Sequence, residues 1–126
     1  MAESDLTTLL RTMQPALFPQ PYGYAVCDVP PSFPVFATVA EAEGLTVVAA
    51  LADLEAAGLR SAPWARISLT VQSDLAAVGL TAAFAGALGR EGISCNVIAG
   101  FHHDHLFVPW DRRFDAMAAL EALSRA

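Results

Sequence analysis

The sequence contains no lysine, and its seven basic residues are all arginines, which give no basic stripe along the chain. Thirteen acidic residues bring the formal net charge to −6 at pH 7. A protein that binds nucleic acid neutralises phosphates with gathered Lys and Arg side chains. We therefore expect no nucleic acid among the partners of this chain.

Long hydrophobic runs are also missing. Asp53, Arg60 and Asp74 interrupt the longest candidates, so no run approaches the roughly 18 residues that cross a bilayer. Glu3 and Asp5 precede the first leucines, whereas a secretory signal begins with basic residues. We expect a cytoplasmic protein that does not span a membrane.

Charged residues make up only 16% of the chain, against 55% hydrophobic residues, and an average soluble domain has about 25% charged residues. So little surface charge favours a buried interface. The two cysteines, Cys27 and Cys95, each lie in apolar, strand-like sequence, where a thiol behaves as a small hydrophobe; a disulfide between them stays an open alternative. The glycines after residue 78 are scattered through a helix and its end, so a phosphate-binding loop has little support.

The first half predicts a helix, three strands and a second helix. Ser4 is placed to cap a helix that runs to Met13, and three prolines between residues 14 and 22 predict an extended connector. We expect strands at 23–29, 35–42 and 45–49, the last two forming a hairpin. A helix over 50–57 should end at Gly58 in a left-handed conformation.

In the second half, apolar and polar residues alternate over 64–73, which predicts a strand. Ser73 or Asp74 can cap a helix that runs to Arg90 and ends at Gly92. A strand at 93–101, a turn at 102–104, a strand at 105–108 and a helix at 111–125 follow. The apolar face of that last helix consists of Phe114, Met117, Leu120 and Leu123.

Both halves end in a hairpin followed by a helix, which indicates an internal duplication. The predicted fold is α+β, with halves at residues 1–62 and 63–126 and helices packed on one face of antiparallel sheets. The second half lacks a last strand. One hypothesis is that the halves share strands and that residues 23–29 supply the missing edge.

Three segments carry a family resemblance: ISLTVQSDLAAVGLTA from Ile67, GISCNVIAG from Gly92 and HDHLFVP from His103. They resemble the ACT domain family, and EAEGLTVV from Glu41 with the preceding Phe36 and Ala37 fits as well. More closely, the chain resembles a bacterial group of stand-alone proteins with two ACT-like halves. The resemblance implies ferredoxin-like β-α-β-β-α-β modules, which typically bind amino acids between paired domains and regulate attached enzymes.

The resemblance also implies a ligand site in the loop after the first strand of the second half and at the start of its second strand. The residues are Asp74, Leu75, Val78, Gly79, Leu80, Asn96, Val97 and Ile98. Independently, a strand that leads into a helix over 73–81 presents backbone amides to a carboxylate, and strands disfavour Asn, so Asn96 is a candidate ligand contact. Gly79 inside a helix costs stability unless close packing or a ligand compensates.

Asp74 would repel an anion, so the expected ligand is an amino acid or similar zwitterion bound through its ammonium group. The expected function is a non-catalytic regulatory module that forms a homodimer and acts on a regulated enzyme. Trp64, Phe101 and Trp110 are expected to fill the core, or together to anchor a dimer interface. The alternative is a ligand-free domain for protein interaction or dimerisation.

A third alternative is a metal-binding protein built on His102, His103 and His105 around Asp104. Neighbouring side chains of a hairpin point to opposite sides, and no second cluster completes a ligand shell, so we expect Asp104 to organise the turn and no metal or cofactor to bind. A nucleophilic enzyme would need Cys95 or a serine beside a histidine. Because Cys95 is expected in a buried strand, where a thiol is inert, we expect no catalysis.

Overall fold

The computed structural model describes residues 5–70 and 78–125, which form two compact units. The large unit combines the first 18 residues with the chain from Ala65 onward, and the small unit comprises Pro19–Trp64. Contacts therefore group residues 5–18 with the second half of the chain. The division at residues 1–62 and 63–126 stays a prediction about sequence repeats.

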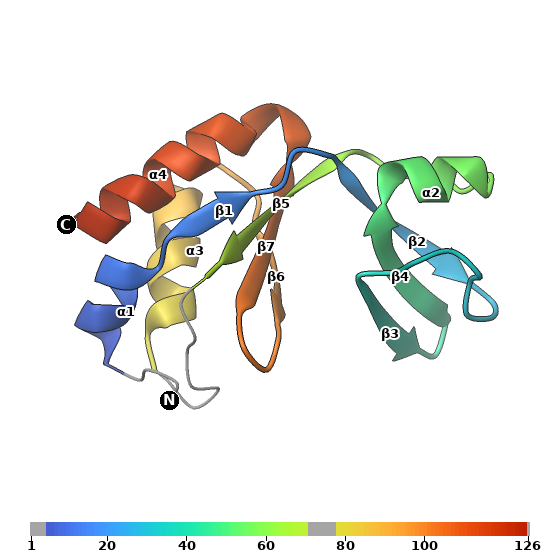
Figure 1. Cartoon of the computed structure of the whole chain (residues 1–126), viewed down its shortest axis with the longest axis horizontal. Helices are drawn as coiled ribbons and strands as arrows, with labels where there is room; N and C mark the ends of the chain where they lie inside the picture. Colours follow the sequence, from blue (N-terminus) through green and yellow to red (C-terminus); the bar gives the residue numbers. More distant parts are fainter. Residues whose placement is uncertain (1–4, 71–77, 126) are drawn as a thin grey trace. The chain divides into compact units, whose positions relative to one another are not determined.

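The described residues of the large unit form four strands and three α-helices (Figure 1). Its strand order is β1-β5-β7-β6, and β6 and β7 form an antiparallel hairpin. In chain order the elements are α1 (Leu6–Thr12), β1 (Pro15–Leu17), β5 (Trp64–Leu69), α3 (Leu80–Arg90), β6 (Asn96–Ala99), β7 (Asp104–Pro109), a 3-10 turn (Trp110–Arg112) and α4 (Arg113–Arg125).

The strand that completes this sheet comes from the N-terminus. β1 pairs antiparallel with β5, with Pro15 opposite Leu69 and Leu17 opposite Ile67. The backbone amide of Phe18 donates to the carbonyl of Arg66 at 2.9 Å, which extends the pairing. The halves therefore share strands, as hypothesised, but Pro15–Leu17 of the first half supplies the edge beside β5, whereas residues 23–27 pair with β4. Proline is tolerated in an edge strand, which explains how a segment expected to be a connector pairs with β5.

The helices of the large unit cover one face of its sheet and build a continuous apolar core (Figure 1). Leu9 and Met13, from the N-terminal segment, are fully buried with Phe84 of α3 and Leu120 of α4. Burial of each such side chain contributes about 1.5–3 kcal/mol. The core residues are Leu9, Met13, Ala65, Ile67, Leu69, Leu80, Phe84, Leu88, Ile93, Leu106, Val108, Ala116 and Leu120.

Several local predictions for the helices are wrong. Asp5, not Ser4, caps α1, and its carboxylate accepts a hydrogen bond from the Thr8 amide at 3.0 Å. α3 begins at Leu80, and Gly79 is its N-cap residue with φ +97°, not an interior residue. Glycine adopts this left-handed conformation without the steric cost that other residues meet. The capping role expected of Ser73 or Asp74 lies outside the described residues.

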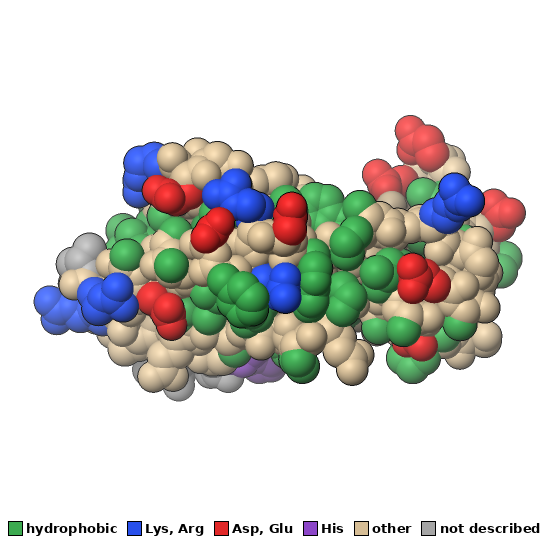
Figure 2. Space-filling model, turned by 90° about the horizontal axis from the view of Figure 1, so that it is seen from above, with side chains coloured by type: hydrophobic (Ala, Val, Ile, Leu, Met, Phe, Trp, Pro, Cys, Tyr) green, Lys and Arg blue, Asp and Glu red, His purple; other side chains and the backbone are tan. Residues whose placement is uncertain are grey.

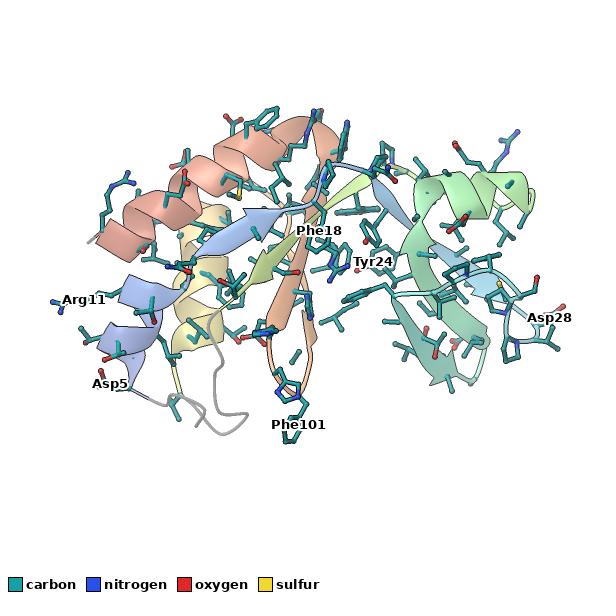
Figure 3. The ribbon with its side chains drawn as sticks, in the orientation of Figure 1. Asp5, Arg11, Phe18, Tyr24, Asp28 and Phe101 are labelled. Carbon is teal, nitrogen blue, oxygen red and sulfur yellow. The ribbon has the colours of Figure 1, made fainter. Side chains whose placement is uncertain are left out.

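Strand ends and aromatic residues also differ from expectation. β5 ends at Leu69 and β6 covers only Asn96–Ala99. Phe114, expected on the buried face of the last helix, is 67% exposed, and the Arg113 guanidinium lies over its ring. Phe101, expected to fill the core, is 77% exposed at the tip of the β6–β7 hairpin (Figure 3). Gly92 ends α3 with φ +70°, as predicted.

The small unit contains β2 (Tyr22–Cys27), β3 (Ala37–Glu41), β4 (Gly44–Ala50) and α2 (Leu51–Ala56). Its strand order is β3-β4-β2, and both pairs are antiparallel. These elements match the predicted hairpin and helix, and Gly58 follows α2 with φ +77°, as expected for a left-handed C-terminal residue. Residues 28–36 connect β2 to β3 without a helix, because prolines at 30, 31 and 34 remove backbone donors.

The small unit has a much smaller core. Val47, Ala49 and Leu54 are buried, and Phe33 and Leu59 pack against them. Gly23 of β2 permits close approach, because an added Cβ would lie 2.6 Å from Ser61 Oγ. Ser61 Oγ accepts a hydrogen bond from the Tyr24 amide at 2.9 Å and donates one to the Ala62 carbonyl at 2.7 Å.

Each unit is thus an α+β structure with an antiparallel sheet, and the large unit has the ferredoxin-like strand order expected for an ACT-like half. Within the described ranges, no helix is long and apolar enough to cross a membrane. On the face drawn in Figure 2, arginines and acidic side chains are interspersed and do not gather into a basic stripe.

Candidate functional site

The residues predicted to follow β5 differ in what they offer a ligand. Asp74 and Leu75 lie outside the described residues. Val78 is 83% exposed, whereas Leu80 is 4% exposed and belongs to the core. Gly79 forms the start of α3, and an added Cβ there would lie 3.0 Å from Leu6 Cδ2. Of the three described residues, Val78 and the backbone of Gly79 are the parts that a ligand can reach.

The residues predicted on β6 lie on an edge strand. β6 ends the strand order of the large unit, and β7 is its partner in the described part of the chain. Val97 packs against the helix-side core. Since side chains alternate along a strand, Asn96 and Ile98 belong to the opposite face, where Asn96 is exposed and Ile98 pairs with His105. Asn96 and Leu80 therefore occupy different sides of the sheet, and their sharing of one ligand stays a prediction.

The histidine-rich turn does not gather its side chains around one point. The imidazole rings of His102 and His103 are 6.3 Å apart, and Phe101 contacts the His102 ring edge-on at 5.1 Å. The amide of Gly100 donates to the His103 carbonyl at 2.9 Å, which closes the turn. Among the residues that the structure describes, no three His, Cys, Asp or Glu side chains are grouped so that they could hold a metal ion.

The Cys95 thiol is half-buried and packs against the core. Burial raises the pKa of Cys95 to about 11, so the thiol stays protonated at neutral pH. The thiolate is the nucleophilic form of cysteine. Cys95 is therefore poorly suited to act as a nucleophile. Cys27, in the small unit, is also a free thiol.

Three polar side chains form a group that the sequence analysis did not identify. Ser68 of β5 is buried, with an exposed fraction of 7%. Its Oγ lies 2.7 Å from Nδ1 of His105 on β7. Arg66 Nε donates to the same Oγ at 3.3 Å. The guanidinium of Arg66 stacks on the Phe18 ring, 3.8 Å from its centroid. Arg66 and Ser68, two residues apart in a predicted strand and therefore on one face, were the sequence feature that could have indicated this group.

The charges around His105 determine its protonation state and its hydrogen bond to Ser68. Burial, together with the positive charges of Arg66 and His103, lowers the pKa of His105 to about 4. His105 is therefore neutral at pH 7 and can accept a hydrogen bond at Nδ1. Because Ser68 Oγ accepts from Arg66, its own hydrogen can go to His105, which favours the tautomer protonated at Nε2. Two hydrogen bonds in series, which we call the relay, then run from Arg66 Nε through Ser68 Oγ to His105 Nδ1.

The small unit has a hollow of its own beside the loop of residues 28–36. It is lined by Val26, Cys27, Asp28, Val29, Pro30, Pro31, Ser32, Phe33, Ala57 and Leu59. Val26 and Val29 are 60% and 69% exposed, and Figure 3 shows Asp28 at the end of β2. This hollow is open and mostly apolar, and it was not part of the predicted site.

Comparison with solved structures finds relatives that cover most of this chain. A protein of unknown function from Vibrio cholerae, described as a possible transport protein, is 44% identical, with a TM-score of 0.81 and coverage of 89% of this chain and 90% of the other. A protein from Agrobacterium tumefaciens is 20% identical, with a TM-score of 0.65 and coverage of 83% and 84%. No curated protein matches the chain.

A more distant structural match is the regulatory subunit of aspartate kinase from Thermus thermophilus, in its ligand-free form. It is 12% identical, with a TM-score of 0.64 and coverage of 89% of this chain and 97% of the subunit. Two family models, each described as the ACT domain, match residues 1–66 and 61–122. Together these matches cover nearly the whole sequence in two successive parts, and the chain belongs to the ACT domain family.

Proposed function

We propose that this chain is a non-catalytic regulatory module that binds an amino acid. Membership of the ACT domain family supports a regulatory, small-molecule-binding role. The likeness to the regulatory subunit of aspartate kinase supports the same fold. The finer proposal names an amino acid or similar zwitterion as the ligand, and a separate enzyme as the protein that the module regulates.

The observation that carries the proposal is the position of Asn96. Its side chain is exposed on β6, the edge strand of the large unit. An edge strand presents unpaired backbone groups to another chain, so a second copy can bring the segment around Val78 and Gly79 to this edge. In that arrangement the ligand lies between two copies, and binding changes how they pair.

Thermal unfolding of the purified, chelator-treated protein against each of the twenty amino acids tests the proposal. A ligand present at 100 times its dissociation constant adds about 2.7 kcal/mol to the free energy of unfolding. We expect one amino acid, or a small related group, to raise the midpoint, and Asn96→Ala to abolish the rise. Thr38→Ala is the matched control, since Thr38 is also exposed on an edge strand, in the small unit.

If no amino acid raises the midpoint, the amino-acid proposal fails and the second candidate, a ligand-free domain for protein interaction, gains support. Sedimentation of the same samples measures whether the chain forms a dimer and whether the amino acid changes it. A dimer that forms in the absence of every amino acid, and that no amino acid changes, is the result expected for the second candidate.

A further inference from the structure

Helix α4 has an outer side that takes no part in the core of the large unit. On its inner side, Ala116 and Leu120 are buried. Residues three or four positions apart share one side of a helix, and the outer side of α4 contains an exposed row with this spacing. The row, which we call the outer row, consists of Asp115, Ala118, Ala122 and Arg125. Its middle is apolar and its two ends are charged.

A groove of about 650 Å³ follows the outer row, on the side where α4 packs against α3 (Figure 1). Asp115, Ala118 and Ala122 line it from α4, and Ala87 lines it from α3. Because an alanine side chain extends little beyond the backbone, another helix can approach closely at these positions. Packed helix axes lie about 8–10 Å apart, depending on the side chains at the contact. The groove therefore fits a helix at the shorter end of this range.

The two ends of the outer row have opposite charges. Asp115 lies in the first turn of α4 and Arg125 in the last turn. Both are five residues from Leu120, and Ala118 and Ala122 are both two residues from it. When two copies of α4 lie antiparallel and cross at Leu120, Asp115 of each copy faces Arg125 of the other, and Ala118 faces Ala122. A twofold axis repeats each pair, so the outer row is complementary to itself.

The carboxylate of Asp115 is oriented within its own chain. Arg112 Nε donates to Asp115 Oδ2 at 3.0 Å, and Arg112 Nη2 donates to the Glu91 carbonyl at 3.1 Å, which ties the start of α4 to the end of α3. The Asp115 side chain is still 65% exposed, and a carboxylate can accept from a second guanidinium. The charged residues that line the groove are Arg90, Glu91, Arg112 and Asp115, whose charges sum to zero. The groove therefore does not repel an entering arginine.

We propose that the outer row of α4 and the groove beside it form an interface for a second copy of this chain, with the two α4 helices antiparallel. The alanines permit close contact of the helices. The charges select the antiparallel arrangement, because parallel helices in register would place Asp115 against Asp115 and Arg125 against Arg125. This interface is separate from the β6 edge at which the amino acid is proposed to bind, and neither proposal depends on the other.

Charge reversal at the two ends of the outer row tests this interface. Asp115→Arg places an arginine opposite the partner's Arg125, and Arg125→Asp places an aspartate opposite the partner's Asp115. Each variant introduces two like-charge contacts in the symmetric dimer, and we expect each to raise its dissociation constant about tenfold or more. The readout is sedimentation equilibrium of the full chain at low ionic strength, where surface charges are screened least.

The matched control is Glu55→Arg. Glu55 is an exposed acidic residue on α2, in the small unit, and the substitution changes the net charge by the same amount as Asp115→Arg does. We expect this variant to dimerise as the wild type does. Circular dichroism of every variant checks that the fold is kept.

A mixture of the two charge-reversal variants separates this interface from a general effect of charge. Asp115→Arg has arginine at both ends of the outer row, and Arg125→Asp has aspartate at both ends. An equimolar mixture therefore pairs opposite charges at both ends. We expect a mixed dimer whose dissociation constant is within about threefold of the wild-type value. The double variant, which exchanges the two charges, should also recover the dimer.

The proposal is overturned if the wild type is a monomer at every concentration, in which case a different protein would be the occupant of the groove. It is also overturned if Asp115→Arg and Arg125→Asp associate as Glu55→Arg does, or if their mixture does not recover the dimer. Association that remains in Asp115→Arg comes from another surface. The response of that association to amino acids then tests the β6 edge alone, so the two proposals fail separately.

Discussion

The two units cover their sheets by different means. In the large unit, α1, α3 and α4 pack on one face over thirteen buried core residues. In the small unit, α2 is the one helix among the described residues, and three buried residues form the core. Each part of the chain matches an ACT domain model. The comparison teaches that a repeat in sequence is not the same as a compact unit, because residues 1–18 match with the first half and pack with the second.

Removal of residues 1–18 should have the largest effect. The large unit would lose β1, which pairs with β5, and the fully buried side chains of Leu9 and Met13. Each buried side chain of this size contributes about 2–5 kcal/mol when truncated, and a domain has only about 5–15 kcal/mol of net stability. We expect the truncated chain to lose the folded large unit, measured by circular dichroism and by the fluorescence of Trp110.

A peptide of residues 1–18 added to the truncated chain is the control, and it should restore the Trp110 signal at high concentration. If the truncated chain keeps a folded large unit without the peptide, then the segment from Ala65 onward folds without residues 1–18. The contacts of residues 1–18 would then contribute little to the stability of the large unit.

Leu54→Ala tests the stability of the small unit. Leu54 is fully buried in a core of three residues, so the loss of about 2–5 kcal/mol falls on a unit of marginal size. We expect the small unit to unfold at lower temperature while the large unit stays folded. Each unit contains one tryptophan, Trp64 or Trp110, so Trp110→Phe and Trp64→Phe backgrounds report on each unit separately.

The matched change is Leu88→Ala, which removes a fully buried leucine from the large core. We expect it to lower the Trp110 transition more than the Trp64 transition. If Leu54→Ala and Leu88→Ala lower both transitions equally, the two units unfold as one cooperative body. The units would then differ in the size of their cores but not in their stability.

Much of the fold could be predicted from local pattern. The hairpins, the helices and the left-handed glycines at 58 and 92 follow from alternation and turn chemistry within a few residues of each other. The origin of the fourth strand could not be predicted, because Pro15–Leu17 pairs with a strand about fifty residues away. A three-residue strand that begins with proline gives no periodic pattern of its own.

The candidate site was predictable only in part. Asn96 was recognised because a strand disfavours it, and the structure places it exposed on β6. Leu80 was predicted as a ligand contact by family analogy, but at the start of α3 its side chain packs in the core of the large unit. Arg66, Ser68 and His105 become a group only when β5 and β7 are neighbours, which depends on the strand order of the whole large unit.

Gly23→Ala tests how tightly the small unit is packed. An added Cβ would lie 2.6 Å from Ser61 Oγ and 2.7 Å from Leu54 Cδ1, so either the side chains or the backbone must move. We expect a loss of about 1–3 kcal/mol in the free energy of unfolding, seen in the Trp64 transition during urea denaturation.

Gly89→Ala is the opposite case in the large unit. Gly89 lies in α3, and an added Cβ would meet no heavy atom within 4 Å. Alanine favours the helix over glycine by about 0.5–1 kcal/mol, so this variant should be more stable than the wild type. A Gly23→Ala variant as stable as the wild type would mean that the β2–Ser61 contact has room to adjust.

The smallest expected effect is a pH dependence confined to the large unit, which contains all three histidines. The pKa of His105 falls from its ordinary 6.5 to about 4 in the folded chain, chiefly through burial. Between these values the unfolded chain binds more protons, so the free energy of unfolding decreases as the pH falls from 6.5 toward 4. Because His105 is partly exposed, solvent screening limits the loss to about 1 kcal/mol.

His105→Gln isolates the contribution of His105 to the pH dependence of unfolding, because Asp104 titrates in both the wild type and the variant. Burial raises the pKa of Asp104, so its protonation stabilises the folded state on acidification and opposes the effect of His105. The difference between the wild type and His105→Gln should therefore grow as the pH falls through this window, in the Trp110 transition and not in the Trp64 transition. An equal pH dependence in both proteins would mean that His105 takes up its proton near pH 6.5 in the folded chain, and the buried relay through Ser68 would lose its support.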